Sequence, residues 1–93
     1  MQQSIFVGLD LGSNHCQQTV INADGSFVSS LSIPTSEFHL RNAFAALGKK
    51  ACVHLEASEL APWVYSIISP LVSQVVVSHP RSLEVDWQRF RQR

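Results

Sequence analysis

Two acids, Asp10 and Glu56, each follow directly on a short apolar segment, residues 4–9 and 51–55. Paired carboxylates bind a hard divalent cation such as Mg²⁺ through their oxygen atoms. Two such ions about 4 Å apart can clamp the attacking and leaving oxygens of a phosphodiester displacement. The pair therefore points to metal-dependent phosphoryl chemistry, if the fold brings the two acids together. Glu56 also has an alternative role, because an acid before a helix favours the positive end of the helix dipole.

The segment that ends in Asp10 is a predicted strand. Residues 4–10 form a nearly continuous apolar run, which is typical of a strand buried on both faces. Residues 17–22 and 26–33 are two further predicted strands, joined by a tight turn at residues 23–25 (Ala-Asp-Gly). We expect these three strands to form an antiparallel meander.

A helix is predicted next, with Thr35 or Ser36 as its cap and Gly48 as its end. Its apolar residues recur at helical spacing between these bounds. The short apolar segment 51–55, which precedes Glu56, is the fourth predicted strand.

A second helix is predicted from a cap at Ser58 to Pro70, and its apolar residues again have helical spacing. Pro62 falls in the first turns of this helix, where its missing N–H is tolerated. Residues 73–78, which contain three consecutive valines, are the fifth predicted strand.

The predicted order is β-β-β-α-β-α-β, an α/β fold. Strand–helix–strand crossovers are right-handed and parallel, so the fourth strand is expected beside the first, in a mixed five-stranded sheet of order 3-2-1-4-5. This is the ribonuclease-H-like arrangement. Asp10 and Glu56 would then end neighbouring parallel strands, at the edge where open α/β sheets bind ligands. His54 alternates onto the same face as Glu56, but a lone histidine without ligand spacing is given no site role.

The composition is that of one small folded domain. The chain has 93 residues, of which 45% are hydrophobic and 15% charged, so the signature of intrinsic disorder is absent. We divide it into residues 1–80, a partial ribonuclease-H-like domain, and residues 81–93, a basic tail expected to form a short helix.

The tail holds the excess positive charge. Residues 81–93 contain 4 arginines and 2 acids, whereas residues 1–80 contain 3 Lys or Arg and 5 acids. Such asymmetry favours contact with nucleic-acid phosphates, and the alternative is a tail that covers the sheet. The residues expected to bind nucleic acid are Arg81, Arg89, Arg91 and Arg93.

Cys16 and Cys52 are too few and too far apart for a disulfide framework or a zinc site, which fits a reducing compartment. The N-terminus has no basic region of a signal peptide, and no apolar run reaches the roughly 18 residues of a spanning helix. We therefore expect a cytoplasmic protein with no membrane contact.

Five segments also occur in this order and spacing in one family. They are residues 5–13 (IFVGLDLGS), 32–35 (SIPT), 55–58 (LEAS), 63–65 (WVY) and 70–81, which runs from PLV through VVV to PR. The chain thereby resembles the N-terminal RuvC-like domain of the DEDD insertion-sequence transposases, a family that includes recombinases directed by a bridge RNA. The resemblance covers about the first 81 residues.

The resemblance implies that Asp10 and Glu56 are the first two acids of the DEDD tetrad, catalytic residues that bind Mg²⁺ or Mn²⁺. It implies DNA as a partner in transposition and recombination, a guide RNA in the full-length family, and a homo-oligomer. The family's other two acids lie in a motif like Lys-Ser-Asp-Arg-x-Asp-Ala, for which residues 82–93 have no match, since Glu84 and Asp86 stand in a different context. We therefore expect a truncated chain that has little nuclease activity alone and need not hold the metal.

Two other functions compete with this one. Residues 8–14 (GLDLGSN) are also similar to the first phosphate loop of the actin, sugar kinase and exopolyphosphatase superfamily, in which backbone N–H groups cradle phosphate. The other alternative is a folded remnant without catalysis that self-associates through an uncovered apolar face of its sheet.

Overall fold

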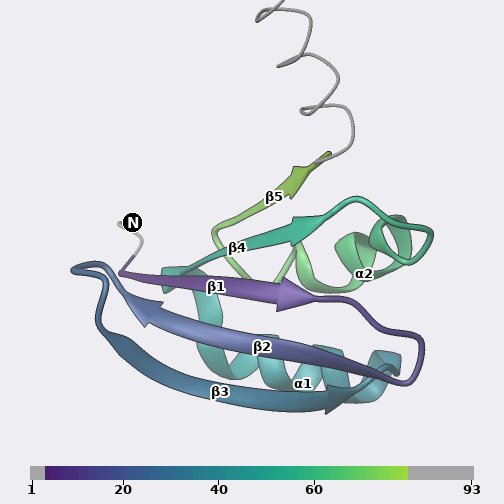
Figure 1. Ribbon diagram of the computed structural model, residues 1–93, viewed down its shortest axis with the longest axis horizontal. Helices are drawn as coiled ribbons and strands as arrows, with labels where there is room; N and C mark the ends of the chain where they lie inside the picture. Colours follow the sequence, from purple (N-terminus) through teal and green to yellow (C-terminus); the bar gives the residue numbers. More distant parts are fainter. Residues whose placement is uncertain (1–3, 80–93) are drawn as a thin grey trace, which may run out of the picture.

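The computed structural model describes residues 4–79, which form one mixed sheet with two helices (Figure 1). The elements are β1 (Ile5–Asp10), β2 (His15–Asn22), β3 (Phe27–Pro34), α1 (Glu37–Leu47), the short 3₁₀ helix η1 (Gly48–Lys50), β4 (Ala51–Glu56), α2 (Ala61–Ile68) and β5 (Gln74–Ser78). The strand order is β3-β2-β1-β4-β5. β2 pairs antiparallel with β1 and with β3, whereas β4 pairs parallel with β1 and with β5. The predicted ribonuclease-H-like fold class is confirmed.

The β2–β3 hairpin turns where the Ala-Asp-Gly sequence predicts. Asn22 donates its backbone N–H to the carbonyl of Ser26 at 2.8 Å, which closes the turn. Gly25 has a φ of 92°, a conformation that glycine adopts without steric cost. Asp24 Oδ1 accepts hydrogen bonds from the Ser26 N–H at 2.9 Å and the Ser26 hydroxyl at 2.7 Å. These bonds lower the pKa of Asp24, the Ser26 hydroxyl having the largest effect.

The first helix has the predicted ends. Ser36 is its N-cap, with Oγ accepting from the His39 N–H at 3.2 Å, and Gly48 ends it with a φ of 72°. The predicted cap of the second helix is wrong. Leu60 is the N-cap, and Ser58 Oγ accepts from the Leu60 N–H at 3.3 Å in the preceding turn. Pro62 explains the later start, because its ring excludes a helical carbonyl four residues earlier, at Ser58.

Both helices lie on the same side of the sheet (Figure 1). The core lies between them and the sheet, where Leu40 and Phe44 of α1 and Val64 and Ile68 of α2 are fully buried. The strands contribute Ile5, Val7, Leu9, Cys16, Val20, Ile33, Ala51, Val53 and Leu55 to this core. We call the other side the open face, since no described helix covers it. The prediction that the first strand is buried on both faces is therefore wrong, and Phe6 on the open face is 42% exposed.

Candidate functional site

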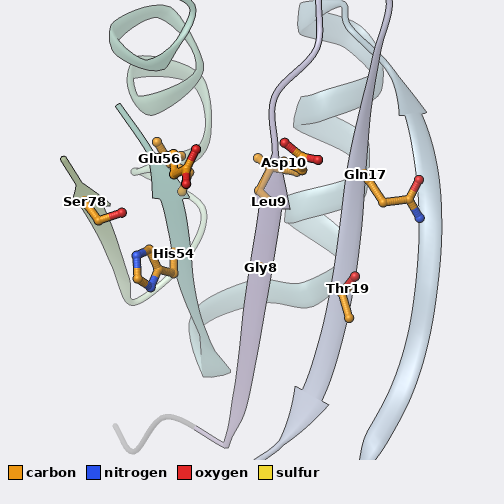
Figure 2. Close-up of a pocket in the computed structure, with 9 residues that line it drawn as sticks. Gly8, Leu9, Asp10, Gln17, Thr19, His54, Glu56 and Ser78 are labelled. Carbon is orange, nitrogen blue, oxygen red and sulfur yellow. The ribbon is translucent and has the colours of Figure 1, made fainter. Parts of the chain in front are cut away.

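Asp10 and Glu56 meet at one edge of the sheet. The parallel ladder between β1 and β4 pairs Leu9 with Leu55, and the next residue on each strand is the acid. Figure 2 shows the two carboxylates at the same level of adjacent strands. Both side chains are exposed, on the open face of the sheet. The predicted juxtaposition of the two acids follows from this register.

The side chains on the open face change from apolar to polar and acidic between the start and the end of β1. At the start of β1, Phe6 pairs with Ile21 on β2 and with Cys52 on β4. One pleat further, Gly8 pairs with Thr19 and His54. The last row contains Gln17, opposite Asp10, and Ser78, opposite Glu56. Polar side chains are therefore concentrated around the two acids.

This polar end is a broad, open hollow of about 790 Å³. Its lining residues are Gly8, Leu9, Asp10, Gln17, Thr19, His54, Leu55, Glu56 and Ser78 (Figure 2). Gly8 forms part of its floor, where a Cβ atom would meet nothing within 4 Å. The hollow is large enough for a phosphate-bearing group, and its polar atoms lie on four strands.

The acids have no cationic partner within the described chain. No Lys or Arg lines the hollow, and the ion pair found within residues 4–79 joins Arg41 to Glu37 on α1. Two carboxylates without a counter-cation, with the Ser78 hydroxyl on the neighbouring strand, are oxygen ligands that suit a hard divalent ion. The Gln17 amide is turned away from Asp10 and donates to Ser30 Oγ on β3 at 2.7 Å (Figure 2). Within residues 4–79, however, no group of three or more His, Cys, Asp or Glu side chains is placed to hold a metal. Water would complete the coordination of an ion held by the two carboxylates alone, as Mg²⁺ commonly requires.

The loop that follows Asp10 is held by Thr35. The Thr35 hydroxyl donates to the carbonyl of Gly12 at 2.7 Å, and the Thr35 N–H donates to the carbonyl of Asn14 at 2.9 Å. Gly12 has no room for a side chain, because a Cβ atom would fall inside the contact distance of the His15 carbonyl oxygen. The connection between β3 and α1 thus fixes the loop beside the candidate site.

Some predicted site residues fall outside the part of the chain that the structure describes, and some lining residues were not predicted. Arg81, Arg89, Arg91 and Arg93 lie outside the described residues. His54 does share the face of Glu56, as the alternation of the strand predicts. Gln17, Thr19 and Ser78 were missed, since only the cross-strand register brings them beside the acids.

No protein-family model and no curated protein matches this chain. A solved structure is similar in fold, a Bacteroides thetaiotaomicron protein with an actin-like ATPase fold and unknown function. The TM-score is 0.57 at 13% sequence identity, over 86% of this chain. The likeness is one of fold alone. This chain spans 34% of the length of that protein.

Membrane insertion has no support in the helices. Neither α1 nor α2, the α-helices of residues 4–79, has the length and apolar character that crossing a bilayer requires.

Proposed function

We propose that this chain corresponds to the N-terminal part of the RuvC-like domain of a cytoplasmic DEDD-type insertion-sequence transposase. The complete domain would act on DNA through metal-dependent phosphodiester chemistry, and this chain alone would have little nuclease activity. The observation that carries the proposal is the placement of Asp10 and Glu56 one residue beyond the Leu9–Leu55 pair. The absence of a cationic partner for either acid among residues 4–79 supports it further.

In this proposal Asp10 and Glu56 hold Mg²⁺ or Mn²⁺ through their carboxylate oxygens. The ion would supply a Lewis acid that activates water and balances charge on the phosphodiester. The Ser78 hydroxyl, opposite Glu56, would help to orient the substrate by donating to a phosphate oxygen. Thr35 would keep the loop after Asp10 in position through its bond to Gly12.

The first test is a titration of the whole chain with Mn²⁺, followed by paramagnetic broadening of backbone NMR signals. Broadening is expected to begin at the ends of β1 and β4 and to be lost in Asp10→Asn and Glu56→Gln. Glu59→Gln is the matched control, because Glu59 is an exposed acid close in sequence that does not line the hollow. A specific site would be excluded if the broadening persisted in both variants, or if Glu59→Gln removed it to the same extent.

A second candidate function is phosphate binding of the kind associated with the actin and sugar-kinase superfamily. The fold likeness to a protein with an actin-like ATPase fold favours it. So does the loop of residues 11–14, since the backbone N–H groups of Gly12, Ser13 and Asn14 donate no hydrogen bond to the rest of residues 4–79. Unpaired N–H groups in one tight loop are donors for an anion.

The two candidates differ in the ligand and in the residues that respond. A titration with ATP or polyphosphate should shift the amide signals of residues 12–14 if the loop binds phosphate. A duplex DNA end with Mg²⁺ should instead perturb the hollow between β1 and β4. Shifts at the loop with ATP alone would promote the second candidate over the first.

A further inference from the structure

The outer edge of β3 is a second surface that the candidate site does not use. β3 is the edge strand next to β2 in the sheet, as Figure 1 shows. One edge of an outermost strand presents backbone N–H and C=O groups that no neighbouring strand pairs. Proteins usually protect such an edge with charged side chains, proline, a bulge or a very short strand.

The middle of β3 has none of these protections. The strand has 8 residues and contains no Asp, Glu, Lys or Arg. A bulge interrupts the ladder at one end, where Ile21 pairs with Phe27 and Val20 with Ser29, leaving Val28 without a partner on β2. Pro34 ends the strand at the other end. Between them, residues 29–33 form a regular segment with no charge and no proline.

Large apolar side chains are exposed along this edge. Phe27 is 67% exposed, and Val28 and Leu31 are about half exposed. Leu31 lies opposite the buried Gln18 of β2, so its side chain is on the same side of the sheet as the helices, at the border of the sheet. β5, at the opposite border of the sheet, has 5 residues, so its edge is shorter.

We propose that β3 pairs with β3 of a second copy of this chain, in an antiparallel, two-fold arrangement that joins two sheets into one. A two-fold axis perpendicular to the sheet keeps the helices of both copies on the same side of the joined sheet. Each residue must therefore pair with a residue whose side chain points to the same side of the sheet. The regular segment of residues 29–33 has Leu31 at its centre. Leu31 then faces Leu31 of the second copy, Ser30 faces Ser32, and Ser29 faces Ile33.

The strand is self-complementary in this register. Antiparallel pairing satisfies the outward backbone groups of both copies, and no like charges meet because β3 has none. The Leu31 pair buries apolar surface that is half exposed in one copy. The interface leaves the hollow at Asp10 and Glu56 open, so it is independent of the proposed function.

The test is the mass of the 93-residue chain in solution, by sedimentation velocity over a series of concentrations. The wild type is expected to form dimers, and Leu31→Lys is expected to shift it to monomers. Tyr65→Lys is the matched control, because Tyr65 is 45% exposed on α2, which contacts β5 at the opposite border of the sheet, and the substitution should leave the dimer intact. Circular dichroism checks that each variant is folded.

The register has its own test, which does not depend on the lysine variant. In a Cys52→Ser background, Leu31→Cys should form a disulfide between copies on mild oxidation, because directly opposed Cα atoms about 4.5–5.5 Å apart lie within disulfide range. Ser30→Cys should not, since two Ser30 residues would be diagonal neighbours about 7–8 Å apart. A monomeric wild type would overturn the proposal. So would a dimer that is dissociated by Phe6→Lys, on the open face, but not by Leu31→Lys.

Discussion

Leu9 of β1 lies directly opposite Leu55 of β4 in the parallel ladder, and each leucine is followed by an acid. Both leucines are buried under the helices, so their neighbours Asp10 and Glu56 point to the open face. The apolar core thereby fixes the register of the two carboxylates. A slip of one residue would bury an acid and expose a leucine, which the core would resist.

The two acids should repel each other when no cation is present. Asp10→Asn is therefore expected to raise the free energy of unfolding by about 0.2–1 kcal/mol in metal-free buffer, since like charges on adjacent strands are destabilising. With Mg²⁺ present the order should reverse, because only the wild type gains from binding. Urea unfolding of both proteins with and without Mg²⁺ measures this. A variant that is no more stable than the wild type in metal-free buffer would argue against close approach of the carboxylates.

Two glycines near the site should respond in opposite ways to alanine. Gly12→Ala places a Cβ atom against the His15 carbonyl, so we expect a loss of about 1–3 kcal/mol in stability. Gly8→Ala meets open space in a strand, so we expect no loss, or a gain of up to about 1 kcal/mol. Thermal unfolding of the two variants checks the contrast. Equal effects would mean that the loop relaxes around the new methyl group.

The Gln18 side chain is a buried polar group in the apolar core. It is 4% exposed, and its Oε1 has no hydrogen-bond partner among residues 4–79. An unsatisfied buried acceptor costs about 1–3 kcal/mol, so Gln18→Met, which keeps the length of the side chain, should stabilise the protein by roughly 1 kcal/mol. Gln17→Met, at the exposed neighbour, is the control, because it removes a satisfied hydrogen bond to Ser30 Oγ and so should not stabilise the protein. Destabilisation by Gln18→Met in chemical denaturation would indicate a buried water that bonds the amide.

The β2–β3 turn should lose stability in acid. Hydrogen bonds from Ser26 lower the pKa of Asp24 in the folded protein, so the ionised carboxylate favours folding. This contribution is complete above the ordinary carboxyl pKa and disappears as the pH falls through the lowered pKa of the folded state. The difference in unfolding free energy between wild type and Asp24→Asn should therefore shrink at low pH. Replacing Ser26 by alanine should weaken that pH dependence, because the hydroxyl bond is lost while the backbone N–H bond remains. A pH dependence that is the same with Ser26 and with alanine would contradict the assignment.

Much of the fold is predictable from local sequence signals. The Ala-Asp-Gly turn, the Ser36 cap and Gly48 act through bonds and backbone angles within a few residues, so their positions can be recognised directly. The start of α2 was misjudged because two local signals compete, the capping preference of Ser58 and the steric effect of Pro62. The prediction that the first strand is buried on both faces is wrong, because hydropathy does not reveal on which side of a sheet a crossover helix packs.

The site was predictable only in part, for a similar reason. Asp10 and Glu56 could be identified because each ends an apolar strand, and His54 because strands alternate. Gln17 and Ser78 line the hollow through pairing across the sheet, which depends on the register of β2 and β5. That register depends on turn geometry and on how the strands pack together, which the residue pattern of one strand does not reveal.

The parallel pairing of β1 with β4 has a consequence for the order of folding. The β1–β2–β3 meander closes through short turns, whereas β4 must return to β1 after α1 and therefore needs a long-range contact. Contacts between residues distant in sequence are slow to form, because the intervening chain must first be ordered. Asp10 and Glu56 would consequently come together only in a late step of folding. Metal affinity, measured during refolding, would report when the central ladder closes rather than when the hairpins appear.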